Sequence, residues 1–383
     1  AFTFEQRKTS KEHTRMELFC HFLLHGTLPW WSSPAEADMD AIVQELHTHQ
    51  PEQLRAFFYR HKENRAVWTR AAFQLNDPAK RAIISLFSEL QTIEIQLSDW
   101  LELCKTYDIR FNESARIPAT AHGVLLRSAP EIFNAQGFEA AITPILDAVL
   151  NEAAADLTED IIQRSKAAFN AQKQQGEDTF PAPPNAQEMD ATLIKAAGNT
   201  HQHNIGISSY AETETDSQQR YLAHHSGVVL LAPFFRQFFD ACGLLDGVEW
   251  KNKNTQYQAV HLLKYLAADS RKTPEYSLVL EKLCCGIALE EPVPLDVGLQ
   301  DDQLAEARAL LSSVIEHWKA LKNTSIDGLR ETFLKRDGLI TRKNDAWLLR
   351  VEQKTLDVLL DSIPWGYSTV ALPWNDYLIH VEW

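Results

Sequence analysis

SIDGLRETFLKRDGLITRKNDAWLLRVEQKTLDVLLDSIPWGYSTVALPWNDYLIHVEW, residues 325–383, is the stretch that decides the expected fold of this chain. Ser325 can cap a helix at its start, and Gly338 is expected to end that helix. The apolar side chains of the helix fall on one face: Leu329, Phe333 and Leu334. The stretch therefore opens with an amphipathic helix.

Short strands are expected after this helix, together with a second helix at residues 355–361. The strand-like runs are separated by polar or proline-containing turns and lie at residues 339–342, 347–351, 367–372 and 377–381. The sequence thus predicts a small α+β unit over residues 325–383. No residue in it has the pattern of a nucleophile or of a metal cluster, so we interpret it as a packing and docking module.

Tryptophan and proline residues are the most distinctive side chains of this unit. The large indole rings can fill a small core or face a protein partner. Each neighbouring proline fixes its own φ and restrains the backbone of the residue before it, so the backbone that leads into the tryptophan has a fixed direction. The same Pro-Trp combination occurs near the start of the chain. We expect these residues to act in docking or in fixing the fold, and the sequence leaves core and interface open for each: Pro29, Trp30, Trp31, Trp347, Pro364, Trp365, Pro373, Trp374 and Trp383.

The overall composition is that of a globular protein. The 383 residues suffice for two or three domains, and 45% hydrophobic with 23% charged residues is close to the average. A formal net charge of -15 argues against a nucleic-acid surface. No run of eighteen apolar residues predicts a membrane span, and the charged start AFTFEQRKTSKEHTR is unlike a signal peptide. Because the chain begins at Ala1 rather than Met, we expect a fragment or a processed chain.

Cysteine and histidine residues give only weak signals of chemistry. An odd number of cysteines without framework spacing indicates reduced thiols, and the vicinal pair Cys284-Cys285 lies in an apolar helical pattern that favours structural burial over a redox or metal role. Histidines recur at i, i+4 with a carboxylate, which allows a metal site but also a solvated helix face. The histidine groups are His13, His21 and His25 with Glu17, then His201 and His203, and His224 and His225. We predict no metal and no cofactor.

Serial amphipathic helices are predicted over residues 1–171. Short polar joints separate them, but no dependable repeat period is present, so a solenoid is not indicated. Ser33, Pro34 and Glu36 form a capping-box signal for one of these helices. The expected helices lie at residues 11–25, 34–49, 51–62, 63–75, 78–107 and 131–155, with another from 159 onward.

Residues 172–220 are polar and poor in helical periodicity, which predicts a linker or a partly ordered loop. A second helical domain is expected over residues 221–324. It begins with a helix at 227–242 that is apolar on nearly all sides and must therefore be covered. Further helices are expected at residues 256–268, 278–287 and 300–322. The predicted fold class is mainly α: a helical N-terminal domain and a C-terminal helical domain that ends in the small α+β unit.

Several uncommon sequence words occur in a fixed order along the chain. GLRETFLKRDG, AWLLRVE, TLDVLLDSIPWG, LPW and VEW follow one another within residues 325–383. LLAPFFRQFFDACGLL (230–245), AVHLLKYLA (259–267) and LEKLCCGI (280–287) precede them, and FLLHGTLPWW (22–31) lies near the start. This set resembles the tape measure protein family of contractile injection systems, phage-tail-like particles that drive a tube through a contracting sheath. The resemblance covers both ends and most of the second half of the chain.

The resemblance implies a structural protein that is involved in tail tube length determination during assembly. The implied partners are tail tube and hub or baseplate proteins, together with other copies of the chain. The implied location is the cytoplasm during assembly and then the injection particle. An assembly chaperone or scaffold that leaves the particle is an alternative function.

A carbohydrate-active hydrolase is a weaker alternative. Tryptophans near carboxylates suit sugar rings, as in Trp30 and Trp31 with Glu36, and Trp347 with Glu352. However, the sequence contains no phosphate-binding loop, dinucleotide fingerprint, nucleophile elbow or Cys-x-x-Cys motif. The sequence therefore favours a protein that is not an enzyme.

Overall fold

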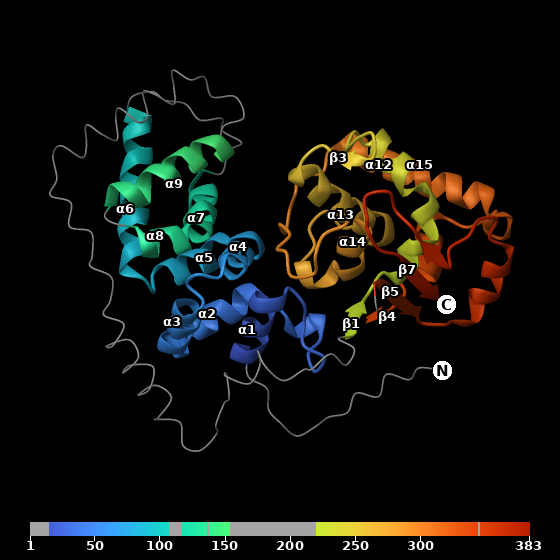
Figure 1. Ribbon diagram of the computed structural model, residues 1–383, viewed down its shortest axis with the longest axis horizontal. Coiled ribbons are helices and arrows are strands. Elements are labelled where there is room, and N and C mark those ends of the chain that lie inside the picture. The colour runs from blue at the N-terminus through green and yellow to red at the C-terminus, as the bar shows by residue number, and fades with distance from the viewer. Residues whose placement is uncertain (1–14, 107–116, 136–137, 154–219, 344) are drawn as a thin grey trace, which may run out of the picture. The chain divides into compact units, whose positions relative to one another are not determined.

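The computed structural model describes residues 15–106, 117–135, 138–153, 220–343 and 345–383, and its chain divides into two compact units (Figure 1). We call them the N-terminal unit, whose described part lies within residues 15–24 and 28–153, and the C-terminal unit, described within residues 220–383. Helices dominate both, with one small sheet near the C-terminus, so the predicted mainly α fold class is confirmed.

The N-terminal unit is built from successive short helices. Polar side chains cap three of them: Asp38 accepts a hydrogen bond from Ala41 N at 3.0 Å, and Asn64 and Asn76 occupy the same position before two later helices. The described elements are α1 (Arg15–His25), η1 (Pro34–Glu36), α2 (Met39–His49), α3 (Pro51–Arg60), α4 (Arg65–Gln74), α5 (Asp77–Ile84), α6 (Ser88–Thr106), α7 (Ile117–Arg127), α8 (Ala129–Asn134) and α9 (Phe138–Ala153).

Three of the predicted N-terminal helices are each divided in the structure. The helix expected at 131–155 corresponds to α8 and α9, because the backbone is extended at Ala135, where α8 ends. The helix expected at 34–49 consists of the single turn η1 and the separate helix α2, because Asp38 provides a second cap after the Ser33 box. The helix expected at 78–107 is interrupted between α5 and α6. There the Ser85 hydroxyl donates to Ala82 O at 2.8 Å, and Gln91 Nε2 donates to Ser85 O. The apolar spacing continues through this break, so periodicity alone did not reveal it.

Aromatic rings form the centre of the N-terminal unit. The fully buried Trp68 on α4 lies with its ring centroid 4.8 Å from that of Phe58 on α3 and 5.9 Å from that of Phe87. Its indole N–H donates to His61 O at 3.2 Å, so the buried polar atom is satisfied. These contacts join α3, α4 and the α5–α6 turn into one core.

The C-terminal unit contains a five-stranded sheet of order β1-β4-β5-β7-β6. Its hairpin of β4 (Gly338–Lys343) and β5 (Ala346–Val351) agrees with the strands expected from sequence, as does the antiparallel pair of β6 (Thr369–Val370) and β7 (Ile379–Glu382). Strand β7 also pairs with β5 in parallel, with Trp347 opposite Ile379. The remaining edge strand, β1 (Arg220–Ala223), comes from more than one hundred residues earlier in the chain and pairs antiparallel with β4. A two-stranded ribbon, β2 (Leu245–Asp246) and β3 (Glu249–Trp250), completes the strands of the described residues.

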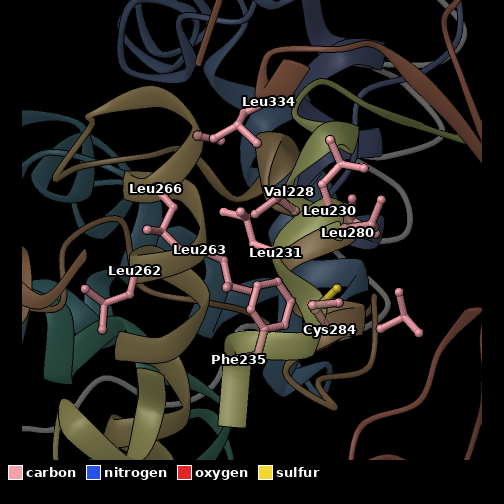
Figure 2. Packing of buried hydrophobic residues seen from close by; sticks show 14 of the residues in the cluster. Val228, Leu230, Leu231, Phe235, Leu262, Leu263, Leu266, Leu280, Cys284 and Leu334 are labelled. Carbon is pink, nitrogen blue, oxygen red and sulfur yellow. The ribbon is translucent and has the colours of Figure 1, made fainter. Parts of the chain in front are cut away.

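The helices of the C-terminal unit surround the same core as the sheet. Figure 2 shows Val228, Leu231 and Phe235 packed toward Leu263 and Leu266, with Leu334 beside them. This cluster runs from Ala223 to Val381, so residues 221–324 and 325–383 share one hydrophobic core. The elements are η3 (Ser226–Phe234), α12 (Phe235–Ala241), α13 (Lys253–Ala268), η4 (Glu275–Ser277), α14 (Val279–Cys284), α15 (Asp301–His317), η5 (Lys319–Leu321), α16 (Ile326–Leu329), η6 (Arg330–Leu334) and η7 (Thr355–Ser362).

The apolar helix expected at 227–242 is not one continuous α-helix. The 3₁₀ helix η3 occupies Ser226–Phe234, and only Phe235–Ala241 are α-helical. Pro233 lies near the end of η3 and has no N–H to donate, which disfavours an α-helix through this point. Gly227 is needed here because a Cβ atom would lie 1.7 Å from Phe333 O.

Gly338 has a different role from the one expected. The helix capped by Ser325 passes into the π-helical turn η6 and ends at Leu334, and Gly338 is instead the first residue of β4. A Cβ atom at Gly338 would lie 2.2 Å from Ser226 Oγ. This close approach of β4 to the start of η3 explains the glycine. The helix expected at 355–361 is present as the 3₁₀ helix η7.

Candidate functional site

The Pro364-Trp365 motif contacts the 3₁₀ helix η3. Trp365 Nε1 donates to Leu230 O at 2.8 Å, and its ring lies edge-on to Phe234 at 5.0 Å between centroids. In a 3₁₀ helix the Leu230 carbonyl would accept from residue 233, but that residue is Pro233 and has no N–H. The indole of Trp365 therefore supplies the donor that the helix itself lacks. Pro364 is exposed beside it.

The Pro373-Trp374 motif contacts the C-terminal end of α14. Trp374 Nε1 donates to Cys284 O at 2.8 Å, while Asn375 Nδ2 and Tyr377 OH donate to Leu283 O at 2.9 and 2.8 Å. Carbonyls at the end of a helix lack the usual partner within the helix, and these three side chains donate to two such carbonyls at the end of α14. Pro373 is exposed.

Gly286 allows this loop to approach α14 closely. The residue has a positive φ of 72° and follows the last turn of α14. Its N–H bonds to Leu283 O, and Ile287 N bonds to Lys282 O at 2.9 Å, as in a Schellman motif. A Cβ atom at Gly286 would lie 2.7 Å from Asn375 Oδ1, so both the backbone angle and the contact require glycine.

The C-terminal Trp383 belongs to a charged network. Its Nε1 donates to Asp357 Oδ2 at 3.0 Å, and Arg336 NH2 donates to Asp357 Oδ1 at 2.7 Å. Arg336 is fully buried, and its guanidinium also lies 5.9 Å from the centroid of the Trp383 ring. The last residue of the chain is thereby connected to η7 and to the segment before β4.

Trp347 lies on β5 and is buried, with its ring 6.2 Å from that of Tyr221 on β1. Beside it is an open hollow at the starts of β5 and β7, whose lining includes Leu348, Tyr377 and the exposed Leu378. Trp347 itself lines this hollow, although most of its side chain is buried against Tyr221 and the core, and Glu352 is not among the lining residues.

The Pro29-Trp30-Trp31 motif lies in the N-terminal unit and differs from the C-terminal motifs. Pro29 is buried and its carbonyl accepts from Ser32 N at 3.0 Å, but the Trp30 side chain is 77% exposed. Trp31 is half-buried. The structure thus brings Trp347, Trp365, Trp374 and Trp383 around one core, whereas Trp30 offers a large apolar side chain to solvent.

The buried polar contacts of the C-terminal unit were not predicted from the sequence, although Trp318 was expected to point inward from the helix at 300–322. Trp318 is fully buried, with its Nε1 donating to Leu359 O and Ser362 Oγ. Lys282 and Glu275 form a buried ion pair at 2.9 Å, and Lys282 Nζ also donates to Leu289 O and Glu291 O. The sequence signal for Lys282 was a charged residue inside the apolar word LEKLCCGI, which required a partner elsewhere in the chain.

The vicinal cysteines and histidines occupy distinct environments. Cys284 and Cys285 are buried, and burial raises the pKa of both thiols. His224 Nδ1 lies 3.1 Å from Asp337 Oδ1, whereas His225 Nδ1 lies 2.5 Å from Lys264 Nζ. Burial, together with Lys264, lowers the pKa of His225 to about 3.

Within the part of the chain that the structure describes, no group of three or more His, Cys, Asp or Glu residues could hold a metal ion. His13, His201 and His203 lie outside the described residues. No helix among those described has the length and apolar character needed to cross a membrane.

The contacts above hold distant segments of the C-terminal unit together. The family model described as contractile injection system tape measure protein matches residues 3–383. The chain therefore belongs to this family, as its ordered sequence words indicated. No significant match was found among curated proteins or among solved structures.

Proposed function

We propose that this tape measure protein takes part in tail tube length determination, and that its two folded units are anchors that bind tube or hub proteins. The family membership over residues 3–383 carries the proposal. The partners would be tail tube and hub or baseplate proteins of the particle, and copies of the chain could contact one another. The protein would act in the cytoplasm during assembly and then reside in the particle.

The lengths of the helices favour anchoring over measuring for the folded units. The longest helices of the described residues are α6 with 19 residues and α15 with 17 residues. At about 1.5 Å per residue these two helices are roughly 29 and 26 Å long. Each is far shorter than the whole chain would be as one continuous helix. We propose that the measuring element is the segment between residues 172 and 219, or copies of the chain arranged along the tube.

Trp30 is the best candidate for a contact with a partner. A tryptophan that is 77% exposed leaves a large apolar surface in water, and tryptophan is enriched among residues that dominate binding energy. Trp365, Trp374 and Trp383 instead donate their indole N–H groups within the C-terminal unit. We propose that these three, with Trp347, fix the fold, and that Trp30 and the adjacent Trp31 dock.

Cross-linking mass spectrometry of purified particles tests the anchoring proposal. Exposed lysines on the C-terminal unit, such as Lys319 and Lys322, provide the cross-linking groups. We expect links from this unit to tube or hub proteins and the presence of the chain in mature particles. Particles that lack the chain would instead support the assembly chaperone or scaffold function and would contradict anchoring. A Trp30→Ala chain should show fewer links from the N-terminal unit, with Val248→Ala as a matched exposed control.

The family is a structural one, and we propose that the chain is not an enzyme. The sugar hydrolase alternative is opposed by the burial of Trp347 and by the ion pair of Glu352 with Lys354 at 3.1 Å. Incubation with chitin and peptidoglycan fragments would test this: product release would contradict the structural function.

A further inference from the structure

A histidine held between two carboxylates joins three helices of the N-terminal unit. His122 on α7 is largely buried. Its Nδ1 lies 2.6 Å from Asp77 Oδ1 at the start of α5, and its Nε2 lies 2.9 Å from Glu94 Oε1 on α6. Both ring nitrogens therefore face an acceptor oxygen.

This geometry requires a particular protonation state. A neutral imidazole carries only one N–H, so one of the two carboxylates would then face a nitrogen lone pair. Only the doubly protonated ring donates to both carboxylates, and each bond is then assisted by charge. We propose that His122 is a pH-sensitive lock of the N-terminal unit, in which loss of one ring proton releases α7 from either α5 or α6.

The electrostatic environment supports this lock. Burial alone would lower the pKa of His122, but the hydrogen bonds and charges of Glu94 and Asp77 outweigh it, so the pKa is raised above 6.5. A raised pKa in the folded state means that the folded chain binds the proton more tightly than the unfolded chain. The stabilisation is therefore complete below the unfolded pKa and is lost as pH rises through the folded pKa.

Other charged groups surround the lock. Arg81 Nε on α5 lies 3.8 Å from the same Glu94 oxygen that faces His122. Burial lowers the pKa of Lys80 on α5, and Asp77, Arg127 on α7 and Asp40 on α2 act on the same ammonium group. All these groups remain in a His122 variant, so a comparison with the wild-type chain isolates the imidazole.

The C-terminal unit provides an internal contrast. There burial, followed by the charge of Lys264, lowers the pKa of His225 to about 3 and keeps the ring neutral. Its contribution to stability is lost as pH falls below 6.5, which is the opposite direction from His122. Alkaline conditions should thus loosen the N-terminal unit without the same effect on the C-terminal unit.

Hydrogen exchange of the full chain between pH 6 and 9, read by mass spectrometry and corrected for intrinsic exchange rates, tests the lock. In the wild-type chain, we expect the opening constant of peptides from α7 to rise by up to about tenfold per pH unit between pH 6.5 and the raised pKa of His122, and to level off above it. In His122→Gln this rise should disappear. The exposed His49 on α2 supplies the matched control, and His49→Gln should keep the wild-type response.

Two results would overturn the proposal: an opening constant of α7 that is independent of pH in the wild-type chain, or an equal pH response in His122→Gln. Should His122→Gln not fold, Glu94→Gln serves as the second variant, because it keeps the histidine and removes one of its two carboxylates. We expect a smaller pH response in Glu94→Gln than in the wild-type chain, and an unchanged response would contradict the lock.

Discussion

Replacement of Trp374 tests whether the Pro-Trp motifs fix the fold of the C-terminal unit. The side chain contributes one hydrogen bond to Cys284 O and ring contacts with Trp250 at 4.8 Å and Phe239 at 5.6 Å. Trp374→Phe keeps an aromatic ring but removes the donor, which should cost about 1 kcal/mol. Trp374→Ala also removes the ring contacts and leaves a cavity, so the expected loss is about 3 kcal/mol.

Native-state hydrogen exchange on peptides from α14 and β5 is the suitable assay, because a chain with two units need not unfold in one step. Trp30→Ala is the matched control: its side chain is 77% exposed, so the expected change is within about 0.5 kcal/mol. Equal losses for Trp374→Ala and Trp30→Ala would refute the reasoning. If Trp374→Ala left the stability unchanged, the indole contacts would not be what holds the loop of Pro373, Trp374 and Asn375 to α14.

Three further substitutions or conditions probe other parts of the C-terminal unit. Gly227→Ala should destabilise this unit by more than about 3 kcal/mol in urea unfolding, because the new Cβ would lie 1.7 Å from a backbone oxygen. Gly366→Ala is the control: a Cβ there would have no atom within 4 Å, so stability should change by less than about 0.5 kcal/mol. Lys282→Met removes the buried ammonium group that pairs with the Glu275 carboxylate and should cost about 3–5 kcal/mol. A chain that also carries Glu275→Gln should recover part of this loss, as a double-mutant cycle would show. The lowered pKa of His225 predicts that β1 and η3 lose protection from hydrogen exchange as pH falls from 6.5 toward 4. His225→Gln should reduce that loss, and an unchanged response to acid in this variant would contradict the role of His225.

Local signals in the sequence account for most of the helices. Capping residues such as Asn64 and Asn76 stand directly before α4 and α5, and the apolar spacing of α15 is regular. The β4–β5 hairpin also follows from its own residues. These elements depend on interactions between close neighbours in the chain, which is why their existence could be predicted.

Interactions between distant segments could not be predicted in the same way. The pairing of β1 with β4 joins Leu222 to Leu339, and nothing in residues 220–223 specifies that partner. The 3₁₀ form of η3 depends on Pro233 and on the indole of Trp365, which lies 135 residues from the carbonyl it caps. The His122 lock likewise requires carboxylates 28 and 45 residues away.

The candidate site residues show the same division. Pro-Trp motifs with a restrained backbone were predicted at both ends of the chain, but the two motifs differ in burial. Trp374 contacts the end of α14, whereas Trp30 faces solvent. Amino-acid type gave no indication of this difference, because a tryptophan after a proline suits a core and an interface equally well.

Tube length in assembled particles tests the tape measure proposal most directly. A flexible insertion of about 30 residues between positions 172 and 219 would add up to about 100 Å of fully extended chain. The same insertion at the exposed Gly247 turn between β2 and β3 is the control, since a Cβ atom there would have no neighbour within 4 Å. If the segment measures, electron microscopy should show longer tubes for the first insertion and unchanged tubes for the second. Tubes of wild-type length in both would contradict the proposal that this segment sets the length.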